Sequence, residues 1–110
     1  MSIIDKFKLN EKIAFITGGA KGIGKSIAIG YAQAGADLAI VDIDLQAAKE
    51  TAEKISKEYG VKTLAIQTDV TQAKEVEAMV KQVNDHFGKI DIAVANAGIA
   101  LNVPAEDMSL

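Results

Sequence analysis

The chain has 110 residues, 49% hydrophobic and 25% charged, with a formal net charge of −3, which is ordinary for one folded domain and argues against disorder. Its positive charges are scattered, and no segment has the roughly 18 apolar residues of a membrane span or the apolar run of a signal peptide, so we expect neither nucleic acid nor a membrane as partner. The absence of cysteine excludes disulfides and thiolate metal sites and fits the reducing cytoplasm, where we expect the protein to act.

Short apolar segments alternate along the chain with segments whose apolar residues recur every three or four positions. This alternation is typical of βαβ units and a parallel sheet. In chain order it predicts a strand over 12–17, a helix over 22–34, a strand over 37–41, a helix over 44–59, a strand over 62–67, a helix over 71–87 and a strand over 90–95. The expected N-caps are Asp44 and Thr71, and the expected stops are Gly35, Gly60 and Gly88. Residues 104–107 are the candidate start of another helix.

The order of these elements predicts an α/β protein with a Rossmann-type three-layer αβα fold. Right-handed crossovers would give a parallel sheet with the strand order 3-2-1-4. In such sheets ligands bind beyond the carboxyl ends of the strands, where the order reverses between the first and the fourth strand. Each candidate site residue below follows such a strand end.

A glycine-rich loop, Thr17-Gly18-Gly19-Ala20-Lys21-Gly22-Ile23-Gly24, joins the first strand to the first helix. Glycines permit a tight turn and remove the Cβ atoms that would block a ligand, and the amides of a helix N-terminus bind phosphate. The Gly-x-x-x-Gly-x-Gly spacing indicates a loop for the diphosphate of a dinucleotide. An ordinary glycine-rich turn is the plainer alternative.

A second motif overlaps the same loop. Residues 19–26 also satisfy the P-loop pattern Gly-x-x-x-x-Gly-Lys-Ser. In that interpretation Lys25 would reach the β and γ phosphates, Ser26 would bind magnesium, and Asp42 would pass for a metal-binding acid. The strand-loop-helix context suits both interpretations, so the loop alone does not decide between them.

Asp42 ends the second strand and is followed by Ile43. A carboxylate at this place can accept hydrogen bonds from both hydroxyls of the adenosine ribose and would repel a 2′-phosphate, which favours NAD over NADP. Lys21 weighs weakly the other way, because a cation beside the loop could meet that phosphate. A helix-capping or turn aspartate is the ordinary explanation of Asp42, although Asp44 is the better cap.

Two further groups follow the third and fourth strands. Asp69 and the amide of Val70 could bracket the amino group of adenine, whereas a simple turn residue is the alternative for Asp69. In Asn96-Ala97-Gly98, small residues would let a flat cofactor lie against the strand end, and the asparagine side chain could tie that strand to neighbouring backbone. Asn and Gly are also a common turn signal.

Together these features resemble the short-chain dehydrogenase/reductase family. The loop 17–24 looks like the family's cofactor loop, and Asp42 looks like its NAD-selecting acid. Asp69-Val70 resembles its adenine contact, and Asn96-Ala97-Gly98 resembles its motif after the fourth strand. The resemblance implies an NAD(P)-dependent oxidoreductase that transfers a hydride between a nicotinamide cofactor and a small alcohol or ketone, with a sugar or polyol as a guess. It also implies a homo-oligomer, a dimer or tetramer. NAD is the expected cofactor, and the expected contacts are Gly18, Ala20, Lys21, Gly22, Ile23, Gly24, Asp42, Ile43, Asp69, Val70, Asn96, Ala97 and Gly98.

The catalytic residues of that family are absent from this sequence. The family uses a serine, a tyrosine and a lysine four residues after the tyrosine, whereas Tyr31 and Tyr59 are followed at that distance by Gly35 and Thr63. His86 fits a solvated helix end. We therefore expect no catalytic residue and no metal site here. Residues 1–110 would be the NAD(P)-binding domain of a longer enzyme, with a non-catalytic nucleotide-binding fragment as the alternative.

Overall fold

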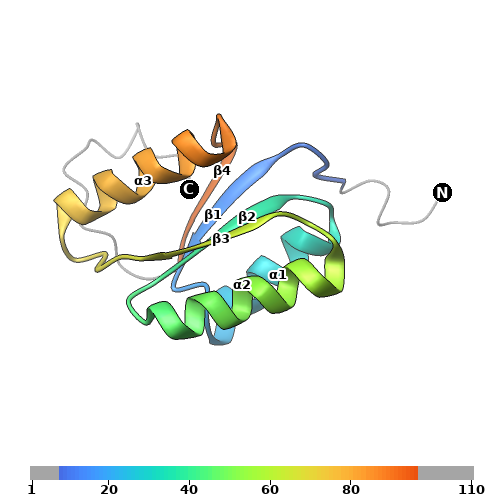
Figure 1. Cartoon of the computed structure of the whole chain (residues 1–110), viewed down its shortest axis with the longest axis horizontal. Helices are drawn as coiled ribbons and strands as arrows, with labels where there is room; N and C mark the ends of the chain where they lie inside the picture. Colours follow the sequence, from blue (N-terminus) through green and yellow to red (C-terminus); the bar gives the residue numbers. More distant parts are fainter. Residues whose placement is uncertain (1–7, 97–110) are drawn as a thin grey trace.

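The computed structural model describes residues 8–96, which form a four-stranded sheet with helices on both faces (Figure 1). The elements are β1 Ile13–Thr17, α1 Gly22–Gln33, β2 Asp37–Asp42, α2 Leu45–Tyr59, β3 Thr63–Gln67, α3 Ala73–Phe87 and β4 Ile92–Ala95. All neighbouring strands are parallel and their order is β3-β2-β1-β4. The predicted α/β fold and its 3-2-1-4 order are confirmed.

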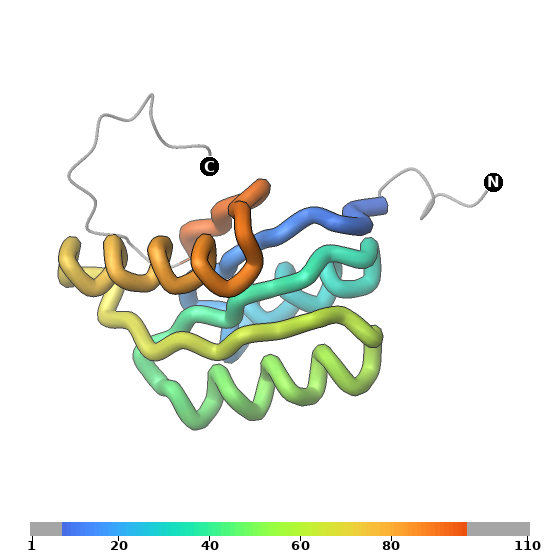
Figure 2. The backbone as a smooth tube through the Cα atoms, turned by 45° about the horizontal axis from the view of Figure 1, so that its top comes forward, coloured from blue at the N-terminus to red at the C-terminus, as the bar shows by residue number. Residues whose placement is uncertain are grey.

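The two central strands are buried because helices cover both of their faces. Every residue of β1 is buried, as are the four central residues of β2, which explains why both strands are nearly continuous apolar runs. The edge strands β3 and β4 are only partly buried. Figure 2 shows β1, β2 and β3 running side by side in one direction.

Alternate residues of the central strands pack into two separate cores. Ile16 and Ile40 face α1 and α2, whereas Phe15 and Val41 belong to the core beneath α3. This division follows from the period of two in a strand, which sends successive side chains to opposite faces. Figure 1 shows the same three layers, with α1 and α2 on one face of the sheet and α3 on the other.

The ends of α2 follow the sequence prediction. The Asp44 carboxylate caps α2 by accepting a hydrogen bond of 3.0 Å from the amide of Ala47. Gly60 follows the helix with a φ of 71°, a left-handed conformation that suits glycine. Gly88 ends α3 in the same way, with a φ of 84°.

The prediction that Thr71 caps α3 is wrong. The helix begins at Ala73, and its N-cap residue Gln72 makes no side-chain capping bond. The amide and the hydroxyl of Thr71 instead donate to Oδ1 of Asp69, at 3.0 and 2.6 Å. Asp69 and Thr71 therefore form a local turn, and the helix begins two residues after Thr71, at Ala73.

Ala97 and Gly98, and the further helix expected from residue 104, lie outside the described residues. Over residues 8–96, none of the helices combines the length and the apolar character that crossing a membrane requires.

Candidate functional site

A hollow of about 400 Å³ opens at the edge of the sheet where the strands end, and its size suits a small ligand. It is lined by residues from the glycine loop, the end of β2 and the loop between β3 and α3, namely Gly18, Asp42, Ile43, Thr68, Asp69, Val70 and Thr71. The structure thus brings together predicted residues from three strand ends. Thr68 and Thr71 were not among the predicted contacts, although their positions beside Asp69 and Val70 are a signal that could have included them.

The glycines of the loop meet two different structural needs. Gly18 and Gly22 have φ angles of 64° and 56°, in the left-handed region that favours glycine. Gly24 lies in α1, where a Cβ atom would collide with the carbonyl of Gly18 and lie 2.9 Å from Nδ2 of Asn96. Two glycines therefore shape the turn, and the third lets the helix approach it.

The N-terminus of α1 is not capped by a protein side chain. Its N-cap residue, Lys21, makes no side-chain capping bond, and the first turn contains no acidic residue. The first amides of a helix need partners, and the helix dipole favours a negative one. This helix end, preceded by glycines, is therefore suited to a phosphate group.

The Asp42 carboxylate connects the loop to the turn after β2. Its Oδ2 accepts a hydrogen bond of 3.2 Å from the amide of Ala20, and its Oδ1 accepts one of 3.1 Å from the amide of Asp44. A carboxylate offers about four acceptor positions, so hydroxyl groups of a ligand can still bind. The main-chain carbonyl of Asp42 also accepts from the amide of Thr68, at 3.0 Å, which joins the two walls of the hollow.

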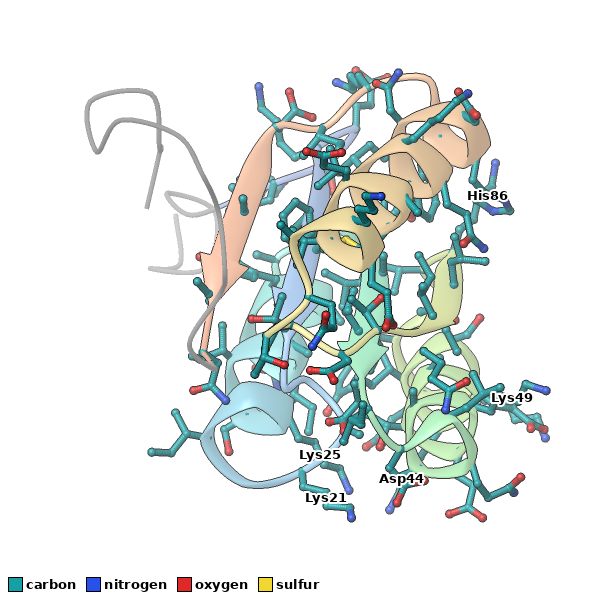
Figure 3. All side chains as sticks on the ribbon, turned by 90° about the vertical axis from the view of Figure 1, so that its left-hand side faces the viewer. Lys21, Lys25, Asp44, Lys49 and His86 are labelled. Carbon is teal, nitrogen blue, oxygen red and sulfur yellow. The ribbon has the colours of Figure 1, made fainter. Side chains whose placement is uncertain are left out.

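Lys21 forms an ion pair with Asp44, with 3.2 Å between Nζ and Oδ2. The amide of Ala47 and then the ammonium of Lys21 hold the pKa of the Asp44 carboxyl below its usual range. Lys21 also lines a second hollow, of about 300 Å³, on the side of α2. In Figure 3, Lys21, Lys25 and Asp44 lie close together, away from the labelled His86.

Asp69 is held in place by its own loop. Its Oδ1 accepts both bonds from Thr71, and its amide donates to Oε1 of Glu75 at 3.0 Å. The hydroxyl of Thr71, followed by its amide, keeps the pKa of the Asp69 carboxyl below the usual value, so the group is ionised near neutral pH. A fixed negative acceptor therefore lies beside Val70 on the wall of the hollow.

Asn96 ties β4 to the glycine loop, as the sequence predicts. Its amide donates to Oγ1 of Thr17 at 3.1 Å, and its Nδ2 donates to the carbonyl of Gly18 at 3.4 Å. The Thr17 hydroxyl in turn donates to the carbonyl of Val94 at 3.4 Å. The contacts expected of Ala97 and Gly98 fall outside the described residues.

Two predicted contacts are large apolar side chains that the protein leaves in solvent. Ile23 is 73% exposed and Ile43 is 59% exposed. Ile43 lines the hollow. Exposed apolar groups beside a polar site are suited to the flat faces of a ligand.

Lys25 and Ser26, which the alternative P-loop pattern requires, do not line the hollow at the strand ends. The Ser26 hydroxyl donates to the carbonyl of Gly22 at 3.3 Å, inside the helix. Lys25 lines the second hollow rather than the one at the strand ends. Among residues 8–96 there is no group of three or more His, Asp or Glu side chains that could hold a metal ion.

The two tyrosines and the histidine do not line the hollow. Tyr31 and Tyr59 pack against the core between the sheet and the α1–α2 layer. His86 is exposed near the end of α3, with its ring centroid 4.6 Å from that of Phe87. A hollow of about 460 Å³ on α3, lined in part by Val76, Val80 and Ile90, contains none of the predicted contacts.

Comparison with known proteins gives matches over most of the chain. The family model described as short chain dehydrogenase matches residues 12–110. A probable NADP-dependent mannitol dehydrogenase of Yarrowia lipolytica is 47% identical over 98 residues, which cover 89% of this chain and 35% of that protein. The D-threitol dehydrogenase of Mycolicibacterium smegmatis is 39% identical over 100% of this chain and 42% of its own length.

Solved structures give the same result. A short-chain type dehydrogenase/reductase from Mycobacterium marinum matches with a TM-score of 0.81 and 43% identity, over 97% of this chain and 45% of that one. L-sorbose reductase from Gluconobacter frateurii, solved with NADPH and L-sorbose, matches with a TM-score of 0.80 and 34% identity, over 94% and 39%. The chain therefore spans less than half the length of these proteins.

Proposed function

Because the chain belongs to the short-chain dehydrogenase family, we propose that residues 1–110 are the dinucleotide-binding domain of an NAD(P)-dependent oxidoreductase. The whole enzyme would transfer a hydride between a small alcohol and the corresponding ketone, and the nicotinamide cofactor would carry that hydride when bound. The family's tyrosine and lysine would lie outside these residues. A polyol or sugar substrate is supported by the names of relatives, which include a mannitol dehydrogenase and a D-threitol dehydrogenase.

The observation that carries this proposal is the Asp42 carboxylate, bonded to the loop amide of Ala20 on the wall of the hollow. In the proposed complex this carboxylate accepts hydrogen bonds from the adenosine ribose. The loop from Gly18 to Gly24, including Ala20, Lys21, Gly22 and Ile23, holds the diphosphate. Ile43, Asp69 and Val70 would contact the adenine, and Asn96, Ala97 and Gly98, which follow β4 in the sequence, would let the flat cofactor lie against the strand end.

We propose NAD rather than NADP as the cofactor. The negative charge of Asp42 would repel a 2′-phosphate, and the positive charge of Lys21 is paired with Asp44. The relatives include an enzyme described as NADP-dependent, so this choice is open to a direct test. We also propose that the enzyme is a homo-oligomer, as the family resemblance implies, and that it acts in the cytoplasm, which the absence of cysteine from residues 1–110 fits.

Binding titrations test the proposal. NADH, NADPH and magnesium-ATP are titrated by calorimetry into the wild-type protein, Asp42→Ala, and the control Glu53→Ala, whose carboxylate pairs with exposed Lys57. We expect NADH to bind more tightly than NADPH. Asp42→Ala should weaken NADH binding about tenfold or more, because hydrogen bonds to a charged group contribute about 1.5–3 kcal/mol.

The control should bind NADH like the wild type, and thermal unfolding checks that each variant is folded. Binding of ATP that requires magnesium and Lys25, with no response to NADH, would contradict the proposal and favour the P-loop alternative. Equal affinities of the wild type for NADH and NADPH would contradict only the choice of cofactor.

A further inference from the structure

The ion pair between Lys21 and Asp44 joins the glycine loop to the first turn of α2. Lys21 follows Ala20, whose amide binds the Asp42 carboxylate, so the lysine begins beside the group that would hold the adenosine ribose. Its ammonium lies 3.2 Å from Oδ2 of Asp44. The positive charge of the loop is therefore bound to a second carboxylate, two residues beyond Asp42.

The loop does not need this ion pair to keep its position. The buried Thr51 hydroxyl donates to the carbonyl of Ala20 at 2.9 Å, and the amide of Gly19 donates to the carbonyl of Val41 at 3.1 Å. With the bond from Ala20 to Asp42, these contacts anchor the loop to α2 and β2. The pair between Lys21 and Asp44 is exposed by comparison, with side chains 69% and 43% accessible. Its effect is therefore on charge rather than on the shape of the loop.

The charges around this corner are nearly balanced. Asp42 and Asp44 contribute two negative charges against the one positive charge of Lys21. The adjoining hollow of about 300 Å³ is lined by Lys21, Lys25 and Lys54 together with Glu50, which makes that side positive. Loss of the Asp44 charge would leave Lys21 free beside the ribose, next to further lysines.

On the basis of the proposed function, we propose that Asp44 is a specificity-determining residue that acts through Lys21. Its carboxylate binds the ammonium of the loop lysine and so withholds that cation from a 2′-phosphate on the adenosine ribose. Asp42 repels the 2′-phosphate directly. Asp44 acts indirectly, because it pairs with Lys21, the cation that would otherwise bind the phosphate. Asp44 is thus a positioning residue for Lys21 and need not touch the cofactor.

Asp44→Asn isolates this role. Asparagine is as good an N-cap as aspartate, so the bond from the Ala47 amide is kept. The bond from the residue-44 amide to Asp42 belongs to the main chain and is also kept. The variant therefore loses the negative charge and, with it, the bond that Oδ2 accepts from Lys21. Glu53→Gln, which removes a charge from the exposed pair with Lys57 on the same helix, is the matched control.

The experiment measures dissociation constants of NADH and NADPH, and of 5′-AMP and 2′,5′-ADP, which carry only the adenosine half. We expect Asp44→Asn to lower the ratio of the NADPH to the NADH dissociation constant by about two- to fivefold, the scale of an exposed charge interaction. The ratio for the two adenosine probes should fall with it. Glu53→Gln should leave both ratios unchanged.

A variant cycle with Lys21→Gln tests whether the effect passes through Lys21. In the Lys21→Gln background, Asp44→Asn should leave the ratio nearly unchanged, because no cation remains to be released. An equal change in both backgrounds, or no change in either, would overturn the inference while NADH binding by the wild type upholds the proposed function. A wild type that binds none of the four compounds would reject both.

Discussion

Gly24 lies where the first turn of α1 passes the carbonyl of Gly18 and the side chain of Asn96. A Cβ atom here would collide with that main-chain carbonyl, which cannot move without opening the loop. We expect Gly24→Ala to lower the free energy of unfolding by about 1–3 kcal/mol, as overpacking does. It should also weaken NADH binding, since the loop would shift. Urea unfolding and calorimetric titration measure the two effects.

Gly30→Ala is the matched control, because it lies in the same helix with nothing within 4 Å of its added Cβ atom. Alanine is the better helix former by about 0.5–1 kcal/mol, so this variant should be more stable than the wild type. Equal stability of the two variants would show that the loop accommodates a methyl group at Gly24.

At the scale of residues, the sequence was informative where a side chain lies at the end of a strand or within two residues after it. Asp42, Asp69 and Asn96 were predicted on that basis, and the structure places each at the same edge of the sheet. Thr51 was missed because it lies inside a regular helix. Its partner is a main-chain carbonyl, that of Ala20, 31 residues away, and such a pairing has no local pattern.

At the scale of elements, Asp91 connects the start of β4 to the start of β1. Its carboxylate accepts a hydrogen bond of 2.8 Å from the amide of Ile13 and lies 3.1 Å from Nζ of Lys89. The Ile13 amide and then Lys89 hold the pKa of the Asp91 carboxyl below its ordinary value of 3.8. A pKa lowered by folding means that the folded state is stabilised by the ionised form. This stabilisation is complete above that ordinary value and is lost as the pH falls through the lowered pKa.

We therefore expect Asp91→Asn to have a lower free energy of unfolding than the wild type at neutral pH. The difference between them should shrink as the pH falls below the ordinary pKa of 3.8. Urea unfolding at several pH values measures this difference directly. Asp85→Asn, which removes an exposed partner of Lys81, is the control and should change stability less. If the difference between Asp91→Asn and the wild type did not depend on pH, the ionised Asp91 carboxyl would not be the source of the stabilisation.

The ends of the elements were predictable where the glycine itself determines the conformation, as at Gly60 and Gly88. The start of α3 was not, because Thr71 can cap a helix or bond to a neighbouring aspartate. The outcome depends on the bond between Thr71 and Asp69 and on the bond between the Asp69 amide and Glu75. The periodicity of the helix reveals neither bond.

At the scale of the whole molecule, alternation and right-handed crossovers were enough to predict the layers and the strand order. The sequence pattern did not show how firmly each layer is joined to the sheet. β1 and β2 connect the two cores, since Ile16 and Ile40 pack on one face and Phe15 and Val41 on the other. A disturbance on either face should therefore reach both.

This coupling leads to a prediction about Ile55 in α2 and Met79 in α3, which are 2% and 1% exposed and lie in different cores. We expect Ile55→Ala and Met79→Ala each to cost about 2–5 kcal/mol, a large part of the roughly 5–15 kcal/mol of a typical domain. Ile23→Ala is the control, because its side chain is 73% exposed, and it should cost less than about 0.5 kcal/mol.

Tyrosine fluorescence and circular dichroism together test whether the two cores unfold in one transition or separately. Tyr31 and Tyr59 pack on the α1–α2 side, so their fluorescence reports that core, whereas circular dichroism reports α1, α2 and α3 together. Because β1 and β2 contribute to both cores, urea transitions followed by the two signals should coincide for the wild type and for both core variants. If Met79→Ala lost helical signal at a lower urea concentration than tyrosine signal, α3 would unfold independently, and the central strands would not couple the two faces.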